Sequence, residues 1–310
     1  MNLIENIQND FPLTSSEIFL LLITAPRRYK LHEIDKRNGR GKRLIAQPTS
    51  EIKVLQRWAT EKYLNQLPIH DAATAYRKGS SIKRHATIHA KNKYLLKLDF
   101  EDFFPSIRSE DFVKHAKLYS KLPEDDIRLL SLLLFRKDKK NGDLILSIGA
   151  PSSPALSNTI MFTFDSAIAG FCKSNNIEYS RYADDLALSS SKPKVLDIAH
   201  NFIINLCKSS EYPRLALNKN KTVFTSQKHS RQLTGLILTN DGLASLGRDK
   251  KRKIRAMAYH FYLGKLDITE IARLRGLLAF SLSIEPIFVE SIRKMIGDEP
   301  FNNLMNFKFN

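Results

Sequence analysis

Residues 177–189 read Ile-Glu-Tyr-Ser-Arg-Tyr-Ala-Asp-Asp-Leu-Ala-Leu-Ser, two strand-like segments that meet at Asp184 and Asp185. No glycine or asparagine stands at their junction to form an ordinary tight turn. Two neighbouring carboxylates repel each other unless a cation lies between them, and a divalent metal ion suits that place. Successive side chains on an extended strand point to opposite faces, so a hairpin turn is needed to bring both toward one site. A surface Asp-Asp turn without a metal is the simpler alternative.

A third carboxylate, Asp99, closes an apolar run of strand length at 94–100. A buried carboxylate is costly there unless a positive group meets it, although Asp99 could also cap the helix that follows. Carboxylates from separate strands are what two-metal phosphoryl transfer requires, with the metals about 3.5–4 Å apart. One ion lowers the pKa of the attacking hydroxyl, and the other stabilises the leaving pyrophosphate. We therefore expect Asp99, Asp184 and Asp185 to form a metal-dependent catalytic centre.

The chain of 310 residues is strongly basic, with 49 Lys and Arg against 32 Asp and Glu and a net charge of +17. Such an excess indicates a polyanionic partner. The basic residues gather at 27–43 and at 248–255, and only Asp249 interrupts the second segment. Runs of this kind bind phosphates and gain affinity by releasing counterions. The candidate nucleic-acid contacts of the second segment are Arg248, Lys250, Lys251, Lys253 and Arg255.

The rest of the composition is that of a globular protein with more than one subdomain. The two cysteines, Cys172 and Cys207, fit a reducing compartment and are too few for a zinc site. No apolar run approaches the roughly 18 residues of a membrane span, and the N-terminus lacks a signal-peptide pattern. We therefore expect a cytoplasmic protein without a membrane partner.

Hydrophobic periodicity predicts a mixed α+β chain. Strands are expected at 29–35, 42–47, 94–100, 144–148, 177–189, 223–224 and 233–238, and the first two form a hairpin with a basic Asn-Gly turn at 36–41. Helices are expected at 15–25, 50–64, 110–135, 154–171, 195–207, 247–263, 267–282 and 285–296. The turn at 240–242 marks the start of an all-helical C-terminal unit.

These segments carry a specific resemblance to a known family. Residues 182–185, Tyr-Ala-Asp-Asp, resemble the catalytic motif of reverse transcriptases, and Asp99 with Phe104 resembles their first palm motif. Residues 149–154, Gly-Ala-Pro-Ser-Ser-Pro, look like the second, and 217–222 and 233–236 look like the next two. The order and spacing match along nearly the whole chain.

The resemblance implies an α+β right-hand polymerase fold with fingers, a palm containing an antiparallel sheet, and a helical thumb. The fingers would comprise 1–95 with part of 108–143, and the palm would comprise 96–107 and 144–240. The thumb would comprise 241–310.

The resemblance also implies roles for single residues. Asp99, Asp184, Asp185 and the backbone carbonyl of Phe100 would hold two Mg²⁺ ions, with Mn²⁺ as an alternative. The incoming dNTP would meet the backbone amides of Asp102 and Phe103, the loop that starts at Gly149, and either Lys42 or Arg43. Phe104 would pack beneath the sugar and exclude a 2′-OH, unless it serves only as core packing. Lys221 would donate a proton to pyrophosphate or act only as a surface charge. One departure is Ile148, which stands where the family usually has a glutamine that touches the nucleotide.

Two short segments resemble the retron reverse transcriptases of bacteria. His85-Ala86-Thr87-Ile88-His89 is similar to a signature that has Asn in place of His85, and Leu233-Thr234-Gly235 is similar to a Val-Thr-Gly triplet. The resemblance implies contacts with RNA or DNA by His85, His89, Leu233, Thr234 and Gly235, although His89 could also be an ordinary core histidine. The aromatic run at 259–262 is expected to pack rather than to stack on bases.

Membership of the retron group would imply a defined partner and product. The enzyme would bind one structured non-coding RNA encoded beside it and prime from the 2′-OH of an internal guanosine. It would use dNTPs to copy part of that RNA into single-stranded DNA that stays branched to it. The complex would serve anti-phage defence with a separately encoded effector protein, since no residues remain for a fused effector, nuclease or maturase domain.

Two rival interpretations stay open. One is another bacterial class of reverse transcriptase, such as the group II intron or diversity-generating type. The other is a catalytically silent RNA-binding scaffold, and the clustered Asp99, Asp184 and Asp185 argue against it.

Overall fold

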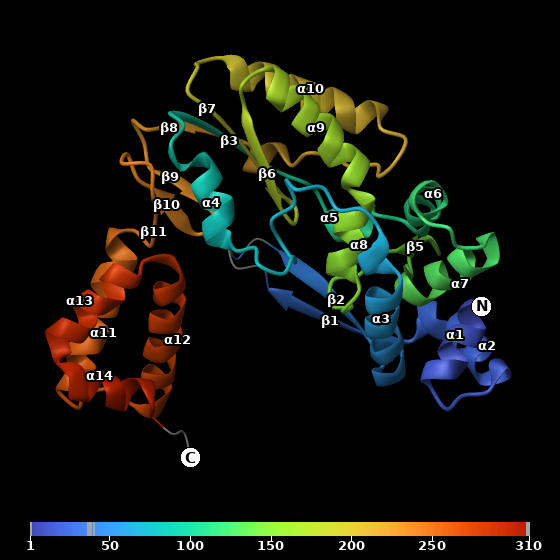
Figure 1. Cartoon of the computed structure of the whole chain (residues 1–310), viewed down its shortest axis with the longest axis horizontal. Coiled ribbons are helices and arrows are strands. Elements are labelled where there is room, and N and C mark those ends of the chain that lie inside the picture. The colour runs from blue at the N-terminus through green and yellow to red at the C-terminus, as the bar shows by residue number, and fades with distance from the viewer. Residues whose placement is uncertain (1, 36–38, 40, 308–310) are drawn as a thin grey trace.

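The computed structural model describes residues 2–35, 39 and 41–307 and confirms the mixed α+β class. Its centre is a four-stranded antiparallel sheet in the order β6-β7-β3-β8 (Figure 1). These strands are β6 (Glu178–Tyr182), β7 (Asp185–Ser190), β3 (Tyr94–Asp99) and β8 (Val223–Ser226). The apolar run at 94–100 thus forms an inner strand, as its lack of polar alternation predicts.

Helices cover both faces of this sheet because its side chains alternate between two buried layers. On one face lie α9 (Phe162–Ser174) and α10 (Val195–Ser209), which also pack against each other. On the other face α4 (Ile82–Ala90) packs across β6 and β7 (Figure 1). The core around the sheet is continuous with that of the N-terminal helices.

The N-terminal part contains helices and the predicted hairpin. It comprises α1 (Leu3–Asp10), α2 (Ser15–Thr24), η1 (Ala25–Arg27), β1 (Tyr29–Asp35), β2 (Lys42–Pro48), α3 (Ser50–Lys62) and η2 (Leu64–Gln66). Capping boxes start α1 at Asn2 with Glu5 and α2 at Thr14 with Glu17. The predicted Asn-Gly turn with Lys36, Arg37 and Arg40 lies outside the described residues.

Two predicted helices were too long. The segment 110–135 forms α6 (Ser109–Tyr119) and α7 (Glu124–Leu134), because Pro123 disfavours a helical residue before it. The segment 154–171 is divided at Met161 between α8 (Ser153–Ile160) and α9. The predicted strand at 144–148 shortens to β5 (Leu144–Ile145), paired with β4 (Arg136–Lys137). A short helix, α5 (Phe103–Ser106), and η3 (Lys219–Lys221) flank the catalytic sheet.

The C-terminal part packs around a second apolar core, which also includes residues of α4 and of the central sheet. It begins with a small sheet of β9 (Arg231–Leu233), β10 (Leu236–Leu238) and β11 (Ala244–Ser245), so the predicted strand at 233–238 was wrong and is a hairpin instead. The turn at 240–242 joins β10 to β11. Four helices follow, α11 (Arg248–Tyr262), α12 (Ile268–Ile284), α13 (Pro286–Ile296) and α14 (Asp298–Met305), the last of which was not predicted (Figure 1).

Buried Arg231 connects this small sheet to the rest of the molecule through hydrogen bonds. Its guanidinium donates to the carbonyls of Ala90 and Asn92, at and after the end of α4, and to those of Leu238 and Thr239, at and after the end of β10. An arginine can satisfy several carbonyls at once because it carries five N–H donors. Within the described residues, no helix is long and apolar enough to cross a membrane.

Candidate active site

The predicted carboxylates meet at one end of the central sheet. Asp99, the last residue of β3, lies directly opposite Asp185, the first residue of β7. Side chains of directly opposed residues share a face with their Cβ atoms about 4.5–5.5 Å apart. Asp184 precedes Asp185 in the turn, and its carbonyl accepts a hydrogen bond of 3.3 Å from the amide of Phe100. The predicted convergence of three carboxylates at the sheet edge therefore has the required topology.

The turn between β6 and β7 is unusually tight. Tyr182 pairs with Asp185, so the loop consists of Ala183 and Asp184 alone. Ala183 has a φ of 58°, a value that side-chain-bearing residues rarely adopt and that two-residue hairpins normally give to glycine or asparagine. Such a conformation costs on the order of 1 kcal/mol or more and persists only where the surroundings hold it.

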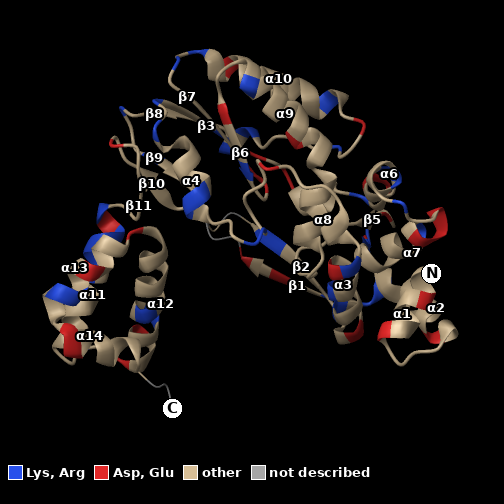
Figure 2. Ribbon diagram, viewed as in Figure 1, with Lys and Arg blue, Asp and Glu red and all other residues tan. Residues whose placement is uncertain are grey.

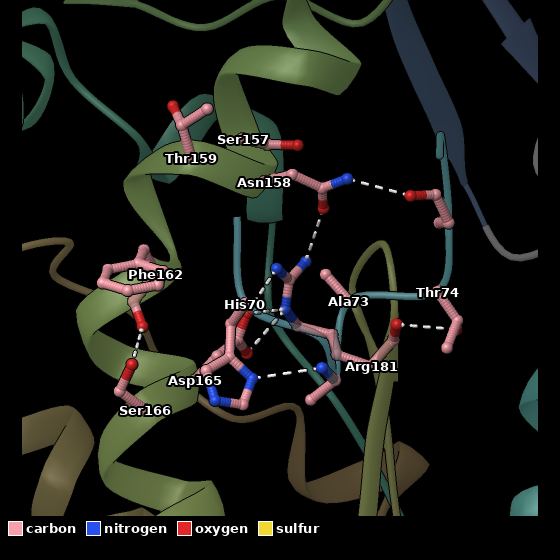
Figure 3. Close-up of polar contacts among 12 residues, drawn as sticks. His70, Ala73, Thr74, Ser157, Asn158, Thr159, Phe162, Asp165, Ser166 and Arg181 are labelled. Carbon is pink, nitrogen blue, oxygen red and sulfur yellow. Dashed lines mark hydrogen bonds and ion pairs between the residues drawn. The ribbon is translucent and has the colours of Figure 1, made fainter. Parts of the chain in front are cut away.

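A buried ion pair beneath the turn supplies that support (Figure 3). Arg181 binds Asp165 of α9 through Nε at 2.9 and 3.1 Å and through Nη2 at 2.7 Å, and both side chains are fully buried. Arg181 Nη1 also donates to the Ala183 carbonyl at 2.9 Å and to Asn158 Oδ1 of α8 at 3.3 Å. The Tyr179 hydroxyl donates to Asp165 Oδ1 at 2.7 Å. The network therefore ties the catalytic turn to two helices, and our sequence reasoning gave its members no role.

The carboxylates strongly perturb one another. Burial, with added repulsion from Asp184 and Asp99, raises the pKa of Asp185 to about 7. Burial and the charge of Asp99 also raise the pKa of Asp184. The ammonium of Lys221 meets both oxygens of Asp99, at 2.8 and 2.9 Å. Although partial burial opposes it, this pairing with Asp99 raises the pKa of Lys221. Lys221 is exposed, yet its ammonium contacts the carboxylate cluster through Asp99.

The chemistry of this cluster fits divalent metal ions. Carboxylate oxygens are the ligands that Mg²⁺ prefers, and repulsion among buried carboxylates is what a divalent ion relieves. Within the described residues, no three acidic, histidine or cysteine side chains lie close enough to hold a metal as they stand. Asp99 is instead held by the ammonium of Lys221, a cation in contact with both of its oxygens.

The structure distinguishes between Lys42 and Arg43, the two candidate ligands for the triphosphate on the basic hairpin. Lys42 and Arg43 are neighbours on β2 and so point to opposite faces. Lys42 pairs with Glu33 at 3.1 Å on the exposed surface. Arg43 lies near enough to Asp184 that its charge opposes the rise in the pKa of that carboxyl. Arg43 is therefore the better placed of the two to meet a triphosphate beside the carboxylates.

Tyr76 is a neighbour of the catalytic turn that our sequence reasoning did not assign. Its φ is 58°, and its side chain is half exposed. Burial, followed by the charge of Asp184, raises the pKa of its hydroxyl. A tyrosine held in a rare backbone conformation beside the carboxylates is a candidate contact for the nucleotide or the template.

The residues predicted to hold the nucleotide lie around α5. Asp102 has a φ of 41° and precedes the helix. Phe103 is buried and stacks on Phe100, with centroids 5.6 Å apart. Phe104 is only partly buried, with its ring edge-on to Phe103 at 5.4 Å. Phe104 thus keeps an accessible surface that pure core packing would not leave, and its role as a gate stays a prediction.

The loop at 149–154 is fixed against the basic hairpin. The amide of Ala46 on β2 donates to the carbonyl of Ile148 at 2.8 Å. Gly149 has a φ of 117°, and a Cβ there would come within 3.0 Å of the Ala46 carbonyl oxygen. Only glycine suits this conformation and this close approach. Ile148 is thus anchored by its backbone at the position where the family usually has glutamine.

His85 and His89 do not reach the surface, which contradicts their expected contact with nucleic acid. Both are fully buried between α4 and the sheet. Ser180 Oγ lies 2.8 Å from His85 Nδ1 and 2.7 Å from His89 Nε2, and His89 Nδ1 is 2.8 Å from Ser189 Oγ. Burial lowers the pKa of His85 to about 4. Both are neutral core histidines, the alternative that the sequence left open for His89.

The hairpin at Leu233-Thr234-Gly235 borders the carboxylates. Leu233 is buried, which excludes direct contact of its side chain with nucleic acid, whereas Gly235 is exposed at the turn. Thr234 has a φ of 47°. A cavity of about 260 Å³ extends from Thr234 to Asp99, Asp185 and Lys221. A primer end held by the Thr234 turn would therefore lie beside the catalytic cluster.

Basic residues occur along α11 (Figure 2), and their side chains differ in the contacts that they make. Arg248 and Lys253 are exposed. Lys251 is paired with Glu285 at 2.6 Å, so it is a less free phosphate ligand than predicted. Lys250 lies over the ring of Phe280 and Arg255 over that of Phe288, at 4.9 and 5.4 Å from the centroids.

The predicted packing of the aromatic run that ends α11 was wrong for three of its four residues, because only Phe261 is partly buried. Tyr259 and Tyr262 are 51% and 55% exposed. Their rings stack on each other, with centroids 6.5 Å apart.

The chain is similar to several known proteins. The family model for reverse transcriptase (RNA-dependent DNA polymerase) matches residues 34–238. Retron Ec83 reverse transcriptase of Escherichia coli is 42% identical over 93% of both chains, and Retron Ec86 reverse transcriptase is 31% identical over 97% of this chain and 93% of that one. Among solved structures, telomerase from Candida albicans matches with a TM-score of 0.47 and 12% identity, over 91% of this chain and 61% of that chain.

Proposed function

This chain belongs to the retron reverse transcriptases, which are RNA-directed DNA polymerases, and from that premise we propose that it copies one cognate structured RNA. It would prime from the 2′-OH of an internal guanosine of that RNA. The product would be a single-stranded DNA that stays branched to its template. The observation that carries the proposal is the meeting of Asp99, Asp184 and Asp185 at one end of the sheet. The chain that carries them matches Retron Ec83 reverse transcriptase over 93% of the length of that protein.

The chain's own residues suggest how the site would work. Asp99, Asp184, Asp185 and the Phe100 carbonyl would hold two Mg²⁺ ions, with Mn²⁺ as an alternative. When bound, the metals would lower the pKa of the attacking hydroxyl and stabilise the pyrophosphate. Arg43 would bind the triphosphate, aided by the amides of Asp102 and Phe103 and by the loop at Gly149. Phe104 would exclude ribonucleotides. Lys221, released from Asp99, would hold a proton at Nζ for the pyrophosphate.

The partners follow from the same premise. Template RNA and dNTPs are those of any reverse transcriptase. RNA contacts would come from Thr234, Gly235 and the exposed basic residues of α11. We further propose a separately encoded effector protein, a role in anti-phage defence and a place in the bacterial cytoplasm. The fingers, palm and thumb would keep the limits predicted from the sequence.

The test is to express the gene with its flanking DNA and to examine the nucleic acid that copurifies with the protein. We expect a molecule in which ribonuclease shortens the RNA but leaves a DNA strand that carries a 2′-linked guanosine. A debranching enzyme should release that strand. Linear DNA primed from an ordinary 3′ end would contradict retron priming and favour another bacterial class. RNA without any DNA would favour the silent scaffold.

A further inference from the structure

The end of the central sheet that lies away from the carboxylates gathers several lysines. Strand β3 runs from Tyr94 to Asp99, so its two ends are about 17 Å apart. Tyr94 pairs with Ser190 at the end of β7 and with Ser226 at the end of β8. The amide of Gln227 donates to the carbonyl of Lys93 at 3.0 Å. Three segments distant in sequence therefore meet here. We call Lys93, Lys192, Lys194, Lys228 and His229 the lysine patch.

The charges of this patch are unpaired. All five side chains are exposed, and within the part of the chain that the structure describes none of the four lysines forms an ion pair. Acids also lie near this end of the sheet, among them Asp197, at the start of α10, and Glu178, on the far edge strand β6. Positive charge therefore exceeds negative charge across the three loops (Figure 2). Lys93 Nζ lies 5.6 Å from the centroid of the Tyr94 ring, and lysines that form no ion pair suit a ligand with repeated negative charge.

The patch surrounds a cavity whose lining is not purely basic. The cavity measures about 250 Å³, and its walls include the acid Asp197 as well as Tyr94, Lys194, Phe224, Thr225, Ser226 and His229. Phe224 is 46% exposed, and the edge of the His200 ring meets it at 5.6 Å between centroids. Ligand pockets of drug size are typically about 300–1,000 Å³. This cavity is smaller and suits a single flat group placed beside an exposed aromatic ring.

We propose that the lysine patch and this cavity bind a single-stranded nucleic-acid segment outside the catalytic site. Lysines on three loops would follow successive phosphates, and Phe224 with Tyr94 would receive one unpaired base, which is the usual design for single strands. A duplex keeps its bases stacked and could not place one in the cavity. An acidic peptide would use the lysines but not the aromatic walls. Unpaired RNA and the DNA product share the phosphates and unpaired bases that this site would bind. The inference rests on the proposed nucleic-acid partner but not on the proposed 2′-OH priming.

The test measures binding at the patch while the catalytic site is filled. The full chain is saturated with an unlabelled primed hairpin, and fluorescence anisotropy then follows labelled RNA or DNA oligomers of about 12 nucleotides, within the range of single-strand sites. The variants are the triple change Lys93→Ala, Lys194→Ala, Lys228→Ala and the single change Phe224→Ala. The matched control replaces the exposed Lys121, Lys173 and Lys208 by alanine. Thermal unfolding and extension of the hairpin verify that each variant is folded.

We expect the triple variant to bind at least about tenfold more weakly and the slope of log affinity against log salt to fall by about 2, the value for three lost phosphate contacts on a single strand. Phe224→Ala should weaken binding with an unchanged slope. Tighter binding of RNA would identify an unpaired part of the RNA as the ligand, and tighter binding of DNA would identify the product. Unchanged affinity and slope in the triple variant would overturn the proposal. The proposal would also be overturned if a glutamate-rich peptide displaced the labelled oligomer as effectively as the unlabelled oligomer does.

Discussion

The buried pair of Arg181 and Asp165 offers a sharp perturbation of the catalytic turn. Asp165→Asn keeps the shape of the side chain but removes the charge that compensates a fully buried guanidinium. Removing one partner of a buried pair costs about 3–5 kcal/mol because the other charge stays buried and uncompensated. Folded domains have a free energy of unfolding of about 5–15 kcal/mol. We therefore expect a folded but weakened protein, which urea unfolding would report.

Activity should fall in the same variant for a geometric reason. Arg181 also donates to the Ala183 carbonyl at 2.9 Å, and a shift of its guanidinium would move the turn that carries Asp184. A displacement of about 1 Å at a catalytic group can lower the rate about 10²-fold. We expect kcat for primer extension to fall by about that factor. The KM for dNTP should change little, because Arg43 and Phe104 lie outside the network.

A double variant separates positioning from stability. Replacing a buried ion pair by apolar residues is often neutral or stabilising, so Arg181→Met with Asp165→Leu should recover the free energy of unfolding. Its kcat should stay low, because the Ala183 carbonyl still lacks its donor. The matched control Tyr179→Phe removes only the hydroxyl that donates to Asp165, at a cost of about 1 kcal/mol and without loss of rate. Full kcat in the double variant would refute the reasoning.

Three further predictions concern other parts of the site. Phe104→Ala should admit ribonucleotides, measured as the ratio of kcat/KM for dNTP and rNTP, and an unchanged ratio would remove its role as a gate. Arg43→Ala should raise the KM for dNTP at least about tenfold, as expected for loss of a charge-assisted contact, whereas Lys42→Ala should not; equal effects would reverse our choice between them. Because the pKa of His85 in the folded protein, about 4, lies below its ordinary value of about 6.5, its stabilising contribution is complete above pH 6.5 and is lost as the pH falls toward 4. His85→Asn should therefore flatten the fall of unfolding free energy between pH 7 and 4 by on the order of 3 kcal/mol, and an equally steep fall in the variant would contradict the burial argument.

The strands and the carboxylates could be predicted because their signals are local. An apolar run at 94–100 and paired segments at 177–189 indicate strands whatever surrounds them. Their antiparallel pairing then places Asp99 opposite Asp185. The break within the segment 110–135 could also have been predicted, because Pro123 disfavours a helical residue before it. The hydrophobic periodicity of the whole segment favoured a single helix instead. The glycine at 235 gave a comparable turn signal inside the predicted strand at 233–238.

The buried polar network could not be predicted because its partners are distant in sequence. Arg181 meets Asp165 on a helix that precedes it by 16 residues, and the ring of His89 meets Ser189 across 100 residues. In the sequence alone, each of these polar residues resembles a surface group or a ligand. Their burial depends on how α4 and α9 cover the sheet, which the sequence does not show. The choice between Lys42 and Arg43 has the same origin. Strand alternation places the two on opposite faces, but only the folded chain shows which face meets Asp184.

The catalytic assignment of the three carboxylates is tested most directly by Asp184→Asn and Asp185→Asn in protein purified with the RNA that it retains. The measurement is the addition of the first deoxynucleotide to that RNA, with Asp125→Asn as a control at an exposed acid on α7. We predict that both catalytic variants retain RNA in the amount found for the unaltered chain and add no nucleotide, while the control is fully active. Nucleotide addition at the normal rate by either catalytic variant would contradict the assignment.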